Sequence, residues 1–142
     1  MIGGIDADRH YHHQCEKQAG ENVHFIGNID HNSEMLKSAY RAKKVFVQPS
    51  WLETPGISAL EASLLRCNLV ITNRSSTKEY FKEMVVYCDP SSLVSIKNGT
   101  KTAMDKDKTK NVSKYILENC MWEPIARGIL NVYEKSLVLH ER

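Results

Sequence analysis

The sequence has no long apolar run and no excess of one charge. No segment is apolar for long enough to span a membrane, and no cationic leader with an apolar signal core stands at the start. The 19 Lys and Arg residues are scattered among 17 Asp and Glu residues, and the formal net charge is +2. Nucleic-acid-binding proteins usually gather their basic residues on one segment or face, so this even distribution argues against nucleic acid as the main partner.

Cysteine is also scarce, and its spacing excludes two common classes of protein. The four cysteines are Cys15, Cys67, Cys88 and Cys120. They form neither the short-spaced pairs of a zinc or redox site nor the dense pattern of a secreted disulfide scaffold, so we interpret them as reduced thiols of a cytoplasmic protein. His10, His12, His13 and Cys15 are of the residue types that bind zinc, but their spacing fits no closed site. We therefore interpret them as surface residues and predict no metal.

The remaining composition is that of one globular domain. The chain has 142 residues, of which 42% are hydrophobic and 25% are charged, and this is enough to bury a single core. The first residues, Met1-Ile2-Gly3-Gly4, resemble the end of a β-strand entering a glycine turn, which is a rare start for a natural protein. We expect residues 1–142 to be a single domain of a longer protein, truncated at its N-terminus.

Short β-type runs alternate with helical patterns along the chain. The predicted strands are residues 23–26, 45–47, 69–72 and 85–88. The predicted helices are residues 8–19, 32–40, 56–65, 77–83, 91–104, 108–119 and 123–139. Parallel strands need crossover connections, so this order predicts an α/β fold with a Rossmann-like parallel sheet and helices on both faces. Ligands of such sheets bind beyond the carboxyl ends of the strands.

Two of the predicted helices have apolar residues at helical spacing, which we expect to face the sheet. In the earlier helix these residues are Met35, Leu36, Ala39 and Tyr40. In the later helix they are Ile57, Leu60, Leu64 and Leu65.

The segment from Val45 to Ala62 places a strand, a loop acid and a glycine-led helix in succession. The N–H groups at the start of this helix, at Gly56 and Ile57, lack intrahelical acceptors and present a positive dipole to a phosphate. Glu53 precedes the helix, and Glu61 lies about one and a half turns beyond Gly56. A carboxylate accepts two hydroxyl hydrogen bonds at once, so either acid can hold a ribose or a hexose. Spacing alone leaves open that both are ordinary solvated acids.

The same segment resembles the signature of the large retaining glycosyltransferase family with the two-Rossmann-domain (GT-B) fold, often called family four. The signature is Pro-Ser-x-x-Glu-x-x-Gly-x-x-x-x-Glu-Ala, which runs here from Pro49 to Ala62. Further segments resemble the family in the same order, namely residues 22–29, 72–79, 87–90, 121–123 and 132–133. Because this ordered set covers nearly the whole chain, residues 1–142 resemble the C-terminal, donor-nucleotide-binding half of a GT-B enzyme.

The resemblance implies roles for the residues that match the signature. It implies that Glu53 is the catalytic acid that faces the donor sugar and that Glu61 holds the ribose hydroxyls. It also implies that Gly56 and Ile57 offer backbone N–H groups to the sugar or the diphosphate.

Three residues outside the signature also match positions of the family. The resemblance implies that Asn28 and Ile29 line the base pocket, largely through the main chain, and that Glu79 is the third acid of the site. One departure concerns the loop near the sugar, where Thr54 and Pro55 replace the family's usual glycine and aromatic residue. The donor sugar is therefore not transferable by analogy.

The resemblance further implies parts that precede Met1. These are the first strand of the domain, an arginine and a lysine that neutralise the diphosphate, and an acceptor-binding domain. A departing diphosphate needs cations or helix dipoles to stabilise its charge, so we expect the chain alone to be inactive. The whole protein is then a hexosyltransferase that uses a UDP-, GDP- or ADP-sugar, retains the anomeric configuration and needs no metal or other cofactor. We expect it in the cytoplasm or at the cytoplasmic face of a membrane.

Two other readings of the sequence stay open. One is a sugar-nucleotide epimerase or a phosphorylase domain of the same fold, which the two glutamates do not exclude. The other is a non-catalytic module that binds a nucleotide or a partner protein. An arginine and a lysine near the turn after the first strand would favour transfer over both alternatives.

Overall fold

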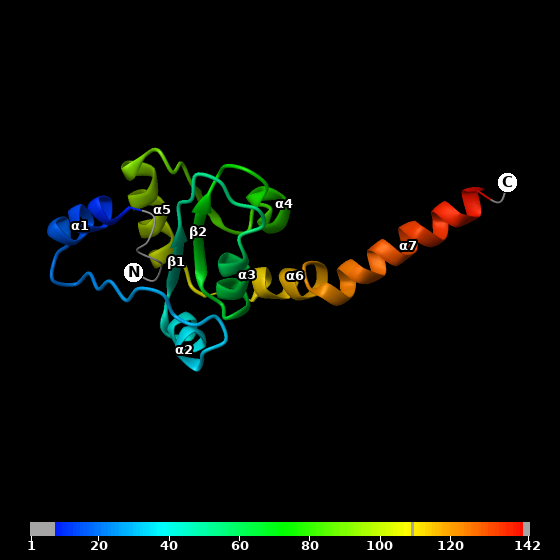
Figure 1. The fold of residues 1–142 in the computed structure, drawn as a ribbon, viewed down its shortest axis with the longest axis horizontal. Helices are drawn as coiled ribbons and strands as arrows, with labels where there is room; N and C mark the ends of the chain where they lie inside the picture. Colours follow the sequence, from blue (N-terminus) through cyan, green and yellow to red (C-terminus); the bar gives the residue numbers. More distant parts are fainter. Residues whose placement is uncertain (1–7, 109, 141–142) are drawn as a thin grey trace. The chain divides into compact units, whose positions relative to one another are not determined.

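The computed structural model of the chain describes residues 8–108 and 110–140. It has two compact units, Met1–Ala39 and Tyr40–Arg142, and each is described by itself. In chain order the elements (Figure 1) are α1 (Arg9–Gln18), α2 (Glu34–Ala42), β1 (Val45–Gln48), α3 (Ile57–Leu64), β2 (Asn68–Thr72), α4 (Thr77–Phe81), β3 (Val86–Cys88), α5 (Leu93–Asp105), α6 (Asn111–Asn119) and α7 (Trp122–His140). The predicted strand end at Met1–Gly4 lies outside the described residues. No helix within the described ranges is both long enough and apolar enough to cross a membrane.

The first unit contains the predicted helix at 8–19, which is confirmed as α1. Asp8 caps it, because its Oδ1 accepts a hydrogen bond from the N–H of Tyr11 at 2.9 Å. The strand predicted at 23–26 is wrong, because these residues are assigned to no strand. Val23 and Ile26 are 42% and 49% exposed. A β-type run forms a strand where its apolar side chains pack on a sheet, and these two side chains remain exposed.

The second unit contains a three-stranded parallel sheet in the order β1-β2-β3. Each of these strands is predicted by the sequence to within one residue at either end. The register pairs Val47 with Val70 and Thr72 with Cys88, so the carboxyl ends of the strands lie along one edge. Residues of β2 are buried on both faces, as expected for a parallel strand covered by helices.

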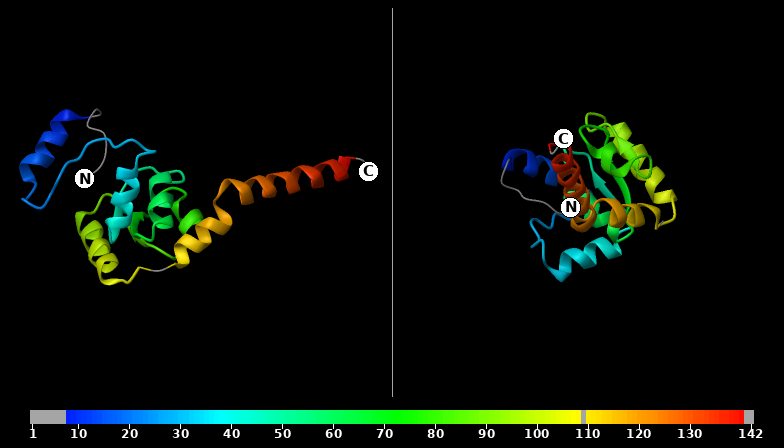
Figure 2. Two further views of the ribbon diagram at one scale, coloured as in Figure 1. Left: turned by 90° about the horizontal axis from the view of Figure 1, so that it is seen from below. Right: turned by 90° about the vertical axis from the view of Figure 1, so that its right-hand side faces the viewer.

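Helices α3 and α5 lie on opposite sides of the sheet (Figure 1, with two further views in Figure 2). On the α5 side, Val70 and Cys88 pack with Ala103 in one buried cluster. Gly99 lets the helix approach closely, because a Cβ there would lie 3.1 Å from Cγ1 of Val70. The predicted α/β class, a Rossmann-like parallel sheet with helices on both faces, is therefore confirmed.

The predicted inward face of α3 is partly wrong. Ile57 is 62% exposed, and the buried residues of the helix are Ala59, Ala62 and Ser63. Small side chains bring α3 close to the sheet, and the first residue of the helix then projects from the sheet edge. In α2, Leu36 and Tyr40 are buried as predicted, whereas Met35 is 59% exposed.

Candidate functional site at the carboxyl edge of the sheet

Three loops leave the sheet from the edge where the strands end. The register pairs Gln48 of β1 with Ile71 of β2 and Thr72 of β2 with Cys88 of β3. The ladder continues one residue further, because the N–H of Asn73 donates to the carbonyl of Cys88 at 2.9 Å. The loops after β1, β2 and β3 therefore start beside one another, which is where open α/β sheets bind their ligands.

Glu53 is held between the end of β1 and the start of α3. The Gln48 amide Nε2 donates a hydrogen bond to Oε2 of Glu53 at 2.6 Å. Gly56 lies on the other side and has a φ of +74°, and a Cβ at this position would be 3.1 Å from Cγ of Glu53. The peptide bond between Thr54 and Pro55 is cis. The structure thus brings Glu53 and Gly56 together, with the half-buried glutamate against the beginning of the helix.

The start of α3 is open to an anion. Gly56 is the N-cap residue and offers no side chain to the first turn, while its carbonyl accepts hydrogen bonds from Ala59 and Leu60 at 2.9 and 3.0 Å. The N–H groups of Ile57 and Ser58 belong to the first turn, where an α-helix supplies no acceptor. Their partial positive charge points out of the helix beside Glu53.

Glu61 lies on α3 one turn after Ser58, and both interact with Tyr40 at the end of α2. Burial raises the pKa of the Tyr40 phenol, a hydrogen bond with Ser58 lowers it, and the charge of Glu61 together with a hydrogen bond to Glu61 raises it again. A phenol with a raised pKa stays protonated at neutral pH, so it can donate toward the Glu61 carboxylate. Glu61 is half-buried and is positioned by a side chain that sequence reasoning assigned only to the core.

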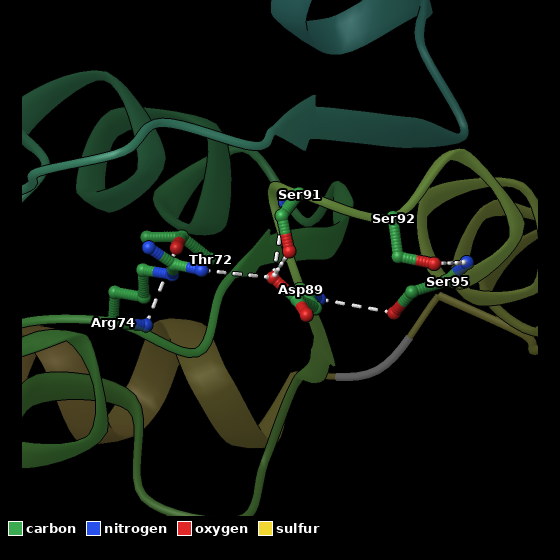
Figure 3. A network of polar contacts seen from close by, with 6 residues as sticks. All are labelled: Thr72, Arg74, Asp89, Ser91, Ser92 and Ser95. Atoms are coloured by element: carbon green, nitrogen blue, oxygen red, sulfur yellow. Dashed lines mark hydrogen bonds and ion pairs between the residues drawn. The ribbon is translucent and has the colours of Figure 1, made fainter.

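A second cluster ties the three loops together at the same edge, and Figure 3 shows the part of it that joins the loops after β2 and β3. Nη2 of Arg74 lies 3.3 Å from Oδ1 of Asp89. The Arg74 guanidinium also lies 4.5 Å from the centre of the Trp51 ring, in the loop after β1. The hydroxyl and the N–H of Ser91 donate to the same Asp89 oxygen at 2.7 and 2.9 Å. These two Ser91 hydrogen bonds, followed by Arg74, hold the pKa of the Asp89 carboxyl below its ordinary value. The loops after β1, β2 and β3 are thus linked through one cation.

The other residues predicted for the site are not brought to Glu53 and Glu61 by any described contact. Glu79 lies on α4, which follows the loop after β2, and its side chain is exposed. Asn28 and Ile29 belong to the first unit, directly after Gly27, where Asn28 is exposed and Ile29 is half-buried. Their proposed place in a base pocket stays a prediction.

Two of the three histidines of α1 lie beside an acid of the same helix. Nδ1 of His12 and Nδ1 of His13 lie 3.6 and 3.5 Å from Oε2 of Glu16. Within the part of the chain that the structure describes, no group of three or more His, Cys, Asp or Glu residues is placed to hold a metal ion.

Sequence reasoning missed Gln48, Tyr40 and Arg74 as members of the site. Gln48 is a polar residue at the last position of a strand, which is a usable signal because that position opens onto the ligand edge. Arg74 follows the end of the next strand and carries the same signal. Tyr40 had no such signal, since its spacing fits a core residue.

Comparisons with known proteins agree with this fold. The sequence model of the family "Glycosyl transferases group 1" matches residues 1–119. An uncharacterized glycosyltransferase of Methanocaldococcus jannaschii is 28% identical over 151 aligned positions, which cover 100% of this chain and 38% of that protein. A sucrose-phosphate synthase from Thermosynechococcus elongatus matches in structure with a TM-score of 0.77 and 23% identity, over 97% of this chain and 38% of the other.

The chain therefore spans 38% of the length of each of these two relatives. The structural likeness at 23% identity supports the fold, and the family match extends over most of the sequence, including every residue of the carboxyl edge. The chain belongs to the group 1 family of glycosyl transferases.

Proposed function

We propose that this chain binds the donor of a retaining glycosyltransferase that moves a hexose from a nucleoside diphosphate sugar to an acceptor. The observation that carries the proposal is the position of Glu53 between Gln48 and Gly56, directly beside the open first turn of α3. An anion-binding helix start next to a carboxylate suits a ligand that joins a diphosphate to a polyhydroxylated sugar. Family membership supports the same reaction class.

Groups at this edge of the sheet match the diphosphate, the sugar and the ribose of such a donor. In the proposal the diphosphate meets the N–H groups of Gly56 and Ile57, and Glu53 accepts hydrogen bonds from the sugar. Glu61 accepts hydrogen bonds from the ribose, because an ionised carboxylate has about four acceptor positions. Asn28 and Ile29 line the base pocket, and Glu79 is the third acid.

The rest of the proposal concerns the whole protein. The acceptor binds to a part of the protein outside residues 1–142, and the reaction needs no metal, because amide dipoles and basic residues balance the diphosphate charge. The protein acts in the cytoplasm or at the cytoplasmic face of a membrane. The base, the sugar and the acceptor are to be found by experiment.

The test is a thermal-shift and calorimetric screen of the full-length protein against uridine, guanosine and adenosine diphosphates and their sugars. One base is expected to stabilise the protein, by about 2.7 kcal/mol when the ligand is present at a hundred times its Kd. Release of the diphosphate from the matching sugar donor is then expected. Binding without release would favour a non-catalytic module, and release with inversion or epimerisation of the sugar would favour another reaction of the same fold.

A further inference from the structure

In the side-chain amide of Gln48, the nitrogen has a hydrogen-bond partner among the described residues and the oxygen does not. Its Nε2 donates to Oε2 of Glu53 at 2.6 Å. Its Oε1 is buried from solvent and accepts no hydrogen bond from any described residue. Gln48 ends β1 and pairs with Ile71, so its backbone is fixed by the sheet while its side chain lies at the ligand edge.

This arrangement is unfavourable for folding. A buried amide oxygen has given up its hydrogen bonds to water and has received none in return, so it lowers the stability of the folded chain. Turning the amide over gives no relief, because it would place two acceptor oxygens 2.6 Å apart at Glu53. An apolar side chain of similar length would carry no such penalty, so stability does not explain a glutamine at this position.

What the amide does achieve is to fix Glu53. Gln48 donates a hydrogen bond to the Glu53 carboxylate, and the Cγ of Glu53 lies 3.1 Å from the point where a Cβ at position 56 would stand, so only a glycine leaves it room. With Oε2 engaged and Cγ supported, the direction of Oε1 is set. Because the Gln48 amide is neutral, it leaves the negative charge of the Glu53 carboxylate in place. A negative carboxylate accepts hydrogen bonds from hydroxyl groups and repels phosphates.

We propose that Gln48 is the positioning residue of Glu53, which holds Oε2 so that Oε1 is presented to a hydroxyl group of the donor sugar. This inference rests on the proposed function and deepens it by naming the residue that orients the acid of the sugar site. Gln48 acts through Glu53 and lowers the stability of the fold in doing so. Stability and turnover are therefore expected to change in opposite directions when its amide is removed.

The experiment uses Gln48→Met, which keeps the length of the side chain and removes both the donor and the unpartnered oxygen. In the full-length protein this variant is expected to have an unchanged or higher Tm and unchanged nucleotide affinity. Its kcat for release of the diphosphate from saturating donor is expected to fall by about tenfold to a hundredfold, because a displaced catalytic group has effects of that size. Gln18→Met, at the exposed end of α1, is the matched control and leaves Tm and kcat unchanged.

A double-mutant cycle separates positioning from packing. In a Glu53→Gln background, Gln48→Met is expected to have no further effect on kcat, because the carboxylate that it orients is gone. Full additivity in this cycle overturns the inference, as does a Gln48→Met variant that keeps wild-type kcat or that loses stability. If wild-type protein binds and cleaves no nucleotide sugar, the proposed function itself fails, and that result is distinct from the other three.

Discussion

At the scale of single residues, the two acids of the signature occupy different surroundings. Glu53 lies at the helix start next to Gln48, whereas Glu61 lies one turn along α3 next to Tyr40. Because the two acids would contact different parts of the donor, substitutions of them are expected to have different effects on binding and on turnover. A group that holds the nucleotide contributes mainly to binding, and a group beside the reacting bond contributes mainly to turnover.

We predict that Glu61→Gln weakens nucleotide binding by about tenfold or more, since charged hydrogen bonds contribute roughly 1.5–3 kcal/mol against about 1 for neutral ones. Glu53→Gln is expected to lower kcat more than nucleotide affinity. The measurements are calorimetry with the diphosphate and turnover at saturating donor. Glu83→Gln is the control, because Glu83 precedes β3 and so lies toward the opposite edge of the sheet. A folded Glu61→Gln protein with unchanged affinity would remove the ribose assignment.

Tyr40 gives a related prediction about stability. Its side chain is buried at 6% exposure, and Ser58 and Glu61 shift the pKa of its phenol in opposite directions. Tyr40→Phe is expected to lower the free energy of unfolding by about 1 kcal/mol, the usual contribution of a buried hydrogen bond. It should also lower nucleotide affinity, because Glu61 loses its internal donor. Urea denaturation and calorimetry measure the two effects, and Tyr133→Phe on an exposed part of α7 should change neither.

A comparison of two glycines with almost the same φ separates the cost of backbone strain from the cost of a side-chain contact. Gly56 and Gly27 have φ of +74° and +75°, but a Cβ at Gly56 would lie 3.1 Å from Glu53, whereas a Cβ at Gly27 would meet no atom of the described residues within 4 Å. Both alanine variants are expected to lose roughly 1–2 kcal/mol from the left-handed conformation. Gly56→Ala should lose more, because Glu53 must also shift. Equal losses in urea denaturation would mean that Glu53 moves freely and is not held in place.

At the scale of elements, the three loops at the carboxyl edge share one charged cluster. Asp89 lies after β3 and is bonded to Ser91 and Arg74, and these hydrogen bonds hold its pKa below its ordinary value. A carboxyl group whose pKa is lowered by folding stabilises the folded chain at pH values above its ordinary pKa. This stabilisation is lost as the pH falls through the lowered pKa. The wild-type chain is therefore expected to lose more stability between pH 7 and pH 3 than Asp89→Asn does. Urea denaturation at both pH values measures this difference, with Asp105→Asn as the control outside the cluster.

The elements also show why the sequence predicts some parts and not others. The runs at 45–47, 69–72 and 85–88 became strands because each has a parallel neighbour and a helix to cover it. The run at 23–26 is also rich in β-type residues but is assigned to no strand, and composition does not reveal the difference. Likewise, spacing located Glu53 and Gly56, because the loop and the helix start are close in sequence. The partners Gln48 and Tyr40 depend on side-chain directions that only the folded chain defines.

At the scale of the whole molecule, the carboxyl edge offers hydrogen-bond donors and acceptors for a nucleotide sugar, while its cation, Arg74, is already paired with Asp89. A diphosphate leaving group needs positive charge that is not already balanced, and transfer needs an acceptor held in place. We predict that residues 1–142 alone bind the nucleoside diphosphate more weakly than the full-length protein and release no diphosphate from the sugar donor. Calorimetry and a diphosphate-release assay on both proteins, at equal concentration and with a buffer control, measure this. Turnover by residues 1–142 above the buffer control would mean that the carboxyl edge is sufficient for cleavage, and that Arg74 serves the diphosphate despite its bond to Asp89.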